Sequence, residues 1–399
     1  MIKKVIIEKA ERLQKIPPGP FVETRRIKLG LTRRGVDVID LGDLNPDPSL
    51  RDFFVLPVEK SDMFARCDLS IWQKLRREAG KWLMQKYELR VRPDTEVLPF
   101  FGERRVIHQL LLSLVNPGDL VAAPDPCDPT YRTASILAGA EVETFPLLER
   151  NDYLPNLTAL PTSGRSTKLP KILFLNYPHD PTSAVTDLGF YREVVEWAGK
   201  KNVLVISDVS GNEICYDDHA PVSLLQTKGA RKLALEKFSF FALTGIQFGF
   251  LVGDKGVIAQ TESLQQALGD RPSKALVLQA LELLRRYSEI SHRNNLEFTL
   301  RRATLLKELF KLNWKTKKPK AGPFVWVKVP PKYSSVGFFR MLLRKAGVIV
   351  SPGFGFGEHG EGHVRIALNP PAEQLHQAME RLLMHSHIWQ RRYRPKSGD

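Results

Sequence analysis

Short runs of apolar residues recur along the chain, and segments with helical spacing separate them. The apolar runs carry little polar alternation and lie at residues 97–101, 120–123, 142–146, 171–176, 202–207 and 249–253. The amphipathic segments between them lie at residues 104–115, 129–138 and 191–200. Strands without alternation are typical of a parallel sheet that helices cover on both faces. The pattern therefore predicts an α/β domain built on a mostly parallel sheet.

A second domain is predicted from the two ends of the sequence. A long helical stretch at 273–312 leads into apolar strands and helices at 323–329, 336–346, 348–351, 363–368 and 372–385. Near the other end, a helix at 22–34 and a short strand at 36–40 form an arm. We expect three parts: an arm joining the small domain, residues 1–45; a large domain, residues 46–285; and a small C-terminal domain, residues 286–399.

The charge of the 399-residue chain is unusually positive, with a formal net charge of +15. Basic runs at residues 315–320 (KTKKPK) and 390–396 (QRRYRPK) could attract nucleic acid or another polyanion. No aromatic side chains interleave a basic patch, and no nucleic-acid motif accompanies the charge. A solvated basic surface is the simpler interpretation, and polyanion binding stays open as an alternative.

The cysteine pattern and the apolar runs bear on location. Cys67, Cys127 and Cys215 are widely separated, which favours neither a disulfide framework nor a metal site. No apolar stretch has the length of a membrane span or of a secretory signal. We therefore expect a cytoplasmic protein with no membrane segment and no metal ligands.

Candidate binding residues follow the predicted strands. In a parallel sheet, ligands bind at the carboxyl ends of the strands. Four segments stand at such ends: Gly102 to Arg104, residues 176–182, residues 208–211, and the stretch around Phe238. We expect them to meet at one edge of the sheet.

An ordered series of motifs carries a resemblance to a known family. The series is AERLQKIPPGPF, GVDVIDLGDLNPD, PDTEVLPFFGERR, VNPGDLVAAPDPCDPTYRTASILAGAE, FLNYPHDPTSAVTD, KKPKAGPFVW and SPGFGFGEHGEGHVRIAL. It spans nearly the whole chain and resembles the class I/II aminotransferases of PLP (pyridoxal phosphate) fold type I, most closely the LL-diaminopimelate aminotransferase group. The resemblance implies a seven-stranded, mostly parallel sheet sandwiched by helices, a small α+β domain and a homodimer.

The resemblance also implies a set of cofactor and substrate contacts. In the family a lysine forms a Schiff base with PLP, and an aspartate pairs with the pyridinium nitrogen. A tyrosine and an asparagine bind the phenolate oxygen, an aromatic residue stacks on the ring, and an arginine with loop amides holds the phosphate. A second arginine binds the substrate carboxylate. Asp208 matches the ring-nitrogen aspartate, and Arg365 matches the carboxylate-binding arginine.

Most other positions depart from the family pattern. Ser239 stands where the lysine is expected and cannot form an imine. Gln247 replaces the phosphate arginine, Gly211 the tyrosine, Asp180 the asparagine and Asp128 the stacking aromatic residue. The predicted phosphate loop is Gly102, Glu103 and Arg104, with arginine at the last position where the family usually has lysine. Leu44 stands at or near a small glycine of the arm.

These departures leave three hypotheses for function. The first is a family member that has lost transamination and binds a small amino-acid-like or carboxylate ligand, with PLP bound weakly or not at all. The second is a rearranged PLP enzyme that uses Lys237, which shares a face with Ser239 in an extended segment. The third is the polyanion-binding protein. A subsidiary hypothesis places Asp128, Asp180 and Asp208 together, beside His179, as a site for a cation or an amine.

Overall fold

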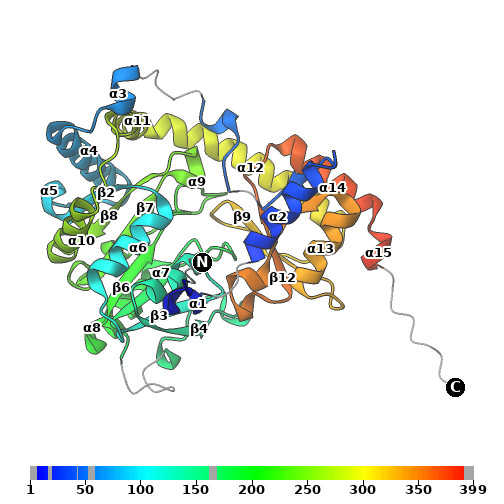
Figure 1. Ribbon diagram of the computed structural model, residues 1–399, viewed down its shortest axis with the longest axis horizontal. Coiled ribbons are helices and arrows are strands. Elements are labelled where there is room, and N and C mark those ends of the chain that lie inside the picture. Colours follow the sequence, from blue (N-terminus) through cyan, green and yellow to red (C-terminus); the bar gives the residue numbers. More distant parts are fainter. Residues whose placement is uncertain (1–6, 17–19, 43, 53–58, 161–168, 391–399) are drawn as a thin grey trace, which may run out of the picture.

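The computed structural model describes residues 7–16, 20–42, 44–52, 59–160 and 169–390. A large α/β domain and a smaller α+β domain lie side by side, with the long helix α12 (Tyr287–Lys311) running between them (Figure 1). Within these ranges, no helix is both long and apolar enough to cross a bilayer. Apart from Gln390, the C-terminal basic run lies outside the described residues.

A seven-stranded sheet forms the centre of the large domain, as predicted. Its spatial order is β2–β8–β7–β6–β5–β3–β4. Strand β8 is antiparallel to both its neighbours, and the remaining pairs are parallel. In that order the strands are Val97–Phe101, Phe248–Gly253, Ala234–Ser239, Leu204–Asp208, Ile172–Asn176, Leu120–Asp125 and Glu141–Pro146.

Helices cover both faces of this sheet. Apolar side chains of α6, α7 and α10 pack on one face, and those of α4, α8 and α11 pack on the other. The local sequence marks their ends: Asp187 caps α8 by accepting a hydrogen bond from the Phe190 amide. The helices of the domain are α3 (Lys60–Phe64), α4 (Leu69–Tyr87), α5 (Pro93–Glu96), α6 (Glu103–Leu114), α7 (Pro129–Leu137), α8 (Leu188–Lys201), α9 (Phe241–Thr244), α10 (Lys255–Ala267) and α11 (Lys274–Arg285).

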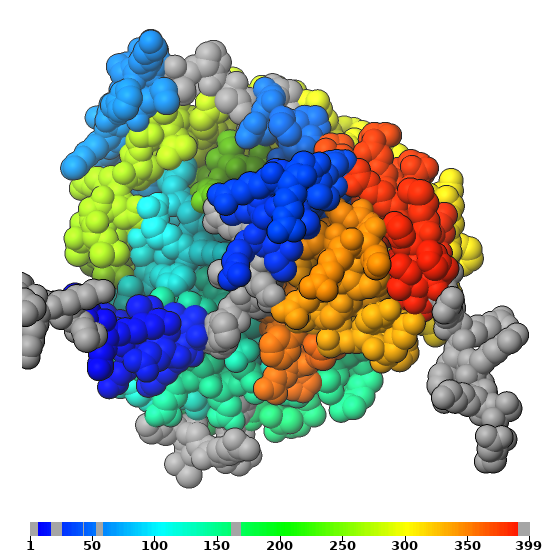
Figure 2. Space-filling model, turned by 45° about the vertical axis from the view of Figure 1, so that its right-hand side comes forward, coloured from blue at the N-terminus to red at the C-terminus, as the bar shows by residue number. Residues whose placement is uncertain are grey.

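The small domain is a three-stranded antiparallel sheet with helices packed against it. The sheet order is β11–β12–β9. The arm joins this domain because its strand β1 pairs in parallel with β10. Figure 2 shows α2 lying on the surface of the small domain, at its border with the large one. The elements of the arm and this domain are α2 (Pro20–Thr32), β1 (Ile39–Asp40), β9 (Phe324–Lys328), α13 (Ser335–Ala346), β10 (Val348–Ile349), β11 (Ser351–Pro352), β12 (His363–Ala367), α14 (Ala372–Met384) and α15 (His387–Gln390). Helix α1 (Glu11–Gln14), which precedes α2 in the sequence, lies instead beside α7 of the large domain (Figure 1).

Two predicted elements are wrong in detail. The helix expected at 273–312 is two helices, since the backbone leaves the helical conformation at Arg286, between α11 and α12. The strand expected at 348–351 is two short strands, β10 and β11, which pair with different partners, β1 and β12. Both segments change direction where the domains and the arm meet.

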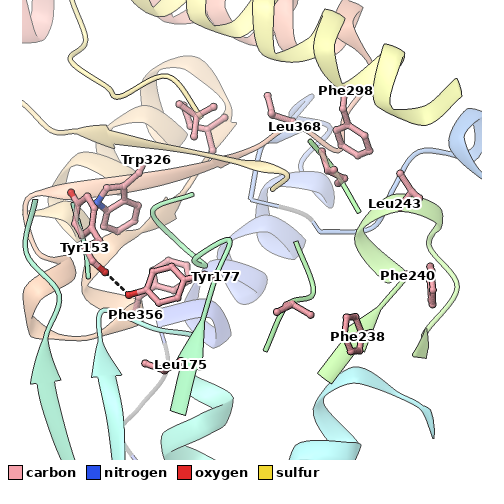
Figure 3. Close-up of a cluster of buried hydrophobic side chains, with 14 of the residues drawn as sticks. Tyr153, Leu175, Tyr177, Phe238, Phe240, Leu243, Phe298, Trp326, Phe356 and Leu368 are labelled. Carbon is pink, nitrogen blue, oxygen red and sulfur yellow. Dashed lines mark hydrogen bonds between the residues drawn. The ribbon is translucent and has the colours of Figure 1, made fainter. Parts of the chain in front are cut away.

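Buried aromatic side chains join the two domains. Tyr153 and Tyr177 of the large domain lie beside Trp326 and Phe356 of the small domain (Figure 3). The Tyr177 hydroxyl donates to the Tyr153 carbonyl over 2.6 Å, and the Trp326 and Phe356 rings lie 5.9 Å apart. This packing fixes the small domain over the carboxyl ends of the large sheet.

Candidate functional site

A cavity of about 1200 Å³ lies between the domains at the carboxyl ends of the large sheet. Residues from the sheet, α6, the arm and the small domain line it, and every candidate site residue from the sequence is among them. These residues are Leu44, Gly102, Glu103, Arg104, Asp128, Asp180, Asp208, Gly211, Lys237, Ser239, Gln247 and Arg365. The structure thus brings the candidates together, while the roles assigned to them stay predictions.

The alternation of strand β7 decides which of its side chains enter the cavity. Lys237 and Ser239 line the cavity, and the intervening Phe238 points to the opposite face. There Phe238 and the following Phe240 pack edge-on against Trp82 of α4, with ring centroids 5.7 and 5.2 Å apart. A shift in register would put phenylalanines into the cavity and charge into the core. The position of Lys237 is therefore fixed by packing.

The Lys237 ammonium group lies in the cavity wall with a partner for each of its three protons. Nζ lies 2.8 Å from Glu103 Oε2, 2.6 Å from Ser210 Oγ and 3.2 Å from Asp208 Oδ2. Burial by itself lowers the pKa of Lys237, but the carboxylates of Asp208 and Glu103 outweigh burial and raise that pKa well above its ordinary value. The nitrogen is therefore held as an ammonium ion, which has no lone pair for nucleophilic attack.

The Asp208 carboxylate is fully occupied by groups of this chain. Lys237 is its register partner on the adjacent strand, so the two side chains emerge next to one another. The Tyr131 hydroxyl donates to Oδ2 over 2.9 Å, and Ser210 donates to Oδ1 from both its amide and its hydroxyl group. Tyr131 is held flat against Phe174 at a centroid distance of 4.7 Å. No lone-pair direction of Asp208 is left free for an external donor.

Asp180 forms an ion pair across the domain boundary. The Arg365 Nη1 group, from β12 of the small domain, donates to Asp180 Oδ1 over 2.6 Å. The Asp180 amide is fixed by the Asn176 side chain, which accepts its hydrogen bond at 2.7 Å. Burial raises the pKa of Asp180, and Arg365 opposes this effect. The charge of Asp180 is therefore compensated by Arg365, and the place of Asp180 in the cofactor site stays a prediction.

The loop predicted to bind phosphate is also engaged internally. Gly102 has φ near +119°, which favours glycine, and its amide donates to the Gln247 carbonyl over 2.8 Å. Glu103, the first residue of α6, turns its carboxylate to Lys237; burial raises the pKa of Glu103, and Lys237 offsets part of this effect. The side chains of Arg104 and Gln247 are exposed at the cavity rim. An acidic side chain thus stands at the positive end of α6, where the family places phosphate.

The three aspartates do not form a shared cation site. Asp128 caps α7 by accepting from the Thr130 amide, Asp180 pairs with Arg365, and Asp208 pairs with Lys237. His179 is buried, and its pKa falls to about 3 because burial disfavours the charged ring. Among the described residues there is no group of three or more side chains suited to hold a metal ion. The subsidiary hypothesis of a cation held by these carboxylates is therefore not supported.

The basic run at 315–320 is partly neutralised. Lys317 pairs with Asp152 over 2.8 Å, and Lys318 pairs with Asp217 over 3.1 Å. These pairs reduce the charge that this run presents to solvent. The geometry therefore adds no support for a polyanion-binding surface in this segment.

Three functional neighbours were missed by the sequence interpretation. Tyr131, Asn176 and Ser210 all line the cavity and hold the charged groups in place. Asn176 and Ser210 stand at the strand ends that the sequence had marked, so their positions were available as a signal. Tyr131 lies in the first turn of α7, and only the packing of α7 on the sheet brings its hydroxyl to Asp208.

Comparisons with known proteins agree on one family. Residues 60–382 match the profile of the aminotransferases of class I and II. The chain is 36% identical to the LL-diaminopimelate aminotransferase of Gloeobacter violaceus, over 94% of this chain and 97% of that protein. It is 33% identical to the LL-diaminopimelate aminotransferase of Aquifex aeolicus, over 94% and 99% of the two chains.

Solved structures with the same architecture include two from bacteria. Substrate-bound BacF of Bacillus subtilis superposes with a TM-score of 0.84 at 26% identity, over 95% of this chain and 98% of that chain. A probable N-succinyldiaminopimelate aminotransferase of Thermus thermophilus superposes with a TM-score of 0.79 at 28% identity, over 91% and 99%. The likeness extends across both domains.

Proposed function

This chain belongs to the aminotransferases of class I and II, and from that premise we propose that it is a non-catalytic member that binds a small amino-acid-like ligand. One observation carries the proposal: the Lys237 ammonium group is bound by Asp208, Glu103 and Ser210. Ser239 stands at the position of the family's lysine, and its side chain has no amine that could react with the cofactor. The cavity thus holds no free amine for the chemistry of the family.

The resident cofactor of the family is PLP, and the residues of this cavity fit it poorly. Asp208, which would pair with the ring nitrogen, already accepts from Lys237, Tyr131 and Ser210. Glu103 stands at the α6 N-terminus, where it would repel a phosphate dianion. Gln247 lacks the charged fork of arginine. The proposed loss of PLP binding therefore rests on an occupied aspartate where the ring nitrogen would bind, and on a repelling carboxylate and a missing arginine where the phosphate would bind.

Lys237 also motivates the alternative, a rearranged enzyme. It is a buried lysine in the right cavity, and no other residue of β7 could supply an amine there. The position of Lys237 argues against a Schiff-base role, because its ammonium group is paired with Asp208, the aspartate that would bind the ring nitrogen. The aldehyde carbon of PLP is attached at the opposite side of the ring from that nitrogen, so a lysine paired with Asp208 is at the wrong end.

We further propose a homodimer, as in the family. Large apolar side chains are exposed together on α3 and at the start of α4: Met63, Phe64 and Leu69 are 54, 87 and 71% exposed. Contiguous exposed apolar surface of this kind marks protein interfaces. A cytoplasmic location remains a prediction from cysteine usage, and the three cysteines are unbridged.

The activity test uses the purified wild-type chain with added PLP. We expect no transfer of amino groups from LL-diaminopimelate, aspartate or aromatic amino acids to 2-oxo acids, and no visible absorption band of a lysine adduct. A curated relative of the LL-diaminopimelate aminotransferase group, assayed in parallel, is the positive control. Turnover above that of free PLP by the wild-type chain would refute the proposal.

A further inference from the structure

The Asp180–Arg365 pair on the cavity wall has hydrogen-bonding capacity to spare. A single bond joins Arg365 Nη1 to Asp180 Oδ1, although a guanidinium and a carboxylate could form two. Arg365 is 4% exposed, and its Nε has no hydrogen-bond partner among the described residues. Asp180 lines the cavity, and 18% of its side chain is exposed. No described residue donates a hydrogen bond to its second carboxylate oxygen. Buried polar groups in this state are expected to meet a ligand or water.

Aromatic side chains fix the position of the Arg365 guanidinium in the cavity wall. The guanidinium carbon lies over two aromatic rings, 4.3 Å from the centroid of Phe324 and 4.7 Å from that of Phe356. Asn369, beside it in the cavity wall, is 1% exposed and leaves Oδ1 without a partner in the described part of the chain. A site fixed before binding loses less conformational entropy when the ligand arrives.

We propose that the cavity binds a free α-amino acid without any cofactor, with the ligand's carboxylate on Arg365 and its ammonium group on Asp180. This inference rests on the non-catalytic function proposed above. In an α-amino acid the two charged groups are attached to one carbon, so they suit partners that lie side by side. Arginine offers the remaining protons of its fork to the carboxylate, and Asp180 offers its second oxygen to the ammonium group.

Charge balance supports this ligand class over a simple carboxylate. Asp180 and Arg365 are together neutral, and a zwitterion is also neutral, so the complex buries no unpaired charge. A carboxylate without an amine would compete with Asp180 for Arg365 and leave one anion poorly compensated. In the family an amide stands at this position; the carboxylate here adds a partner for an ammonium group.

The alternative interpretation is that Asp180 is an internal competitor that keeps ligands away from Arg365. The two interpretations predict opposite signs for Asp180→Asn. If Asp180 holds the ammonium group, the substitution weakens amino-acid binding. If Asp180 blocks Arg365, the substitution strengthens the binding of any carboxylate.

The test is calorimetry on the wild-type chain, free of PLP, with the proteinogenic L-amino acids and LL-diaminopimelate. We expect at least one amino acid to bind. Two analogues of that amino acid, the amine that lacks its carboxylate and the acid that lacks its amine, should bind about tenfold more weakly or worse. Asp180→Asn should weaken binding of the amino acid by a similar factor, and it should not weaken binding of the acid that lacks the amine. Arg365→Lys should weaken both, and Asp254→Asn, at a helix cap outside the cavity, should change neither.

Three results would overturn the inference. They are that no amino acid binds, that the acid lacking the amine binds as tightly as the amino acid, or that Asp180→Asn binds the amino acid more tightly than the wild-type chain does. The wild-type comparison of ligands does not depend on any variant folding. A PLP adduct in the chain would refute the proposed function instead. Absence of both the adduct and amino-acid binding would refute only the inference drawn from Asp180 and Arg365.

Discussion

Replacing Lys237 by methionine is expected to destabilise the protein by about 3–5 kcal/mol, the usual cost of removing one partner from a buried ion pair. Lys237 is 3% exposed and compensates two carboxylates, those of Asp208 and Glu103. Methionine fills a similar volume but leaves both carboxylates without their cation. Urea unfolding of wild type and variant, at mildly alkaline pH so that the carboxylates stay ionised, measures the difference.

A matched control separates this effect from the loss of any lysine. Lys171→Met removes a partner of Asp119 from a pair in which both side chains are partly exposed, 43 and 29%. That change should cost less than about 1 kcal/mol. Adding Asp208→Asn and Glu103→Gln to Lys237→Met should recover part of the lost stability, because the uncompensated charges are then gone. Equal costs for Lys237→Met and Lys171→Met would show that the three side chains do not form a buried ion network.

Ser239→Lys alone is expected to leave the protein without aminotransferase activity. The new lysine restores an amine, but Asp208 remains bound to Lys237, and Gln247 remains neutral. Residue 239 also lies about 7 Å along the strand from residue 237, on the same face. A turnover assay with LL-diaminopimelate is the measurement, and restored activity in this single variant would contradict the account.

Further substitutions should restore PLP binding stepwise in the Ser239→Lys background. Lys237→Met frees Asp208, Gln247→Arg supplies charge for the phosphate, and Asp180→Asn returns a donor. Each restored charged hydrogen bond is worth about 1.5–3 kcal/mol, or roughly tenfold or more in affinity. Visible titration with PLP measures this, and the same substitutions without Ser239→Lys form the control, which should not form a lysine adduct.

Gly211→Tyr is the least favourable step of such a restoration. A Cβ at residue 211 would lie 3.1 Å from Pro178 Cβ and 3.4 Å from Gly322 Cα. Contacts this tight require the neighbouring loops to move before a tyrosine ring can enter. The neighbouring residues leave little room for a side chain at residue 211, and tyrosine should be added last.

The fold followed from the sequence where apolar runs and helix signals were strong. Strands β2, β3, β5 and β6 have mainly apolar runs, and the structure places them close to their predicted residues. Helix α4 was missed because charged residues interrupt its apolar pattern along LSIWQKLRREAGKW, and one of them, Arg76, lies on the buried face with Trp82 and Tyr87. Where the arm and the domains meet, tertiary pairing divided segments that looked continuous.

The sequence allowed us to predict which residues line the site, but not which of them form ion pairs with one another. Strand ends and the family resemblance located Asp208, Asp180 and Lys237, since topology brings such positions to one edge. No pattern in the sequence indicated that Lys237 would reach Asp208, because that contact depends on the register of β7 against β6. Nor did it show that Asp180 would meet Arg365, which lies 185 positions away and reaches it only through the docking of the small domain.

The most direct test of the central claim, that Lys237 is an ion-paired residue and not a cofactor lysine, is borohydride reduction of the wild-type chain after incubation with PLP. Reduction would fix any imine between PLP and a lysine, and peptide mass mapping would locate it. The account predicts that no PLP is attached at Lys237, with surface lysines modified no more than in a chain unfolded before treatment. Stoichiometric PLP on Lys237 would contradict it and establish the rearranged enzyme instead.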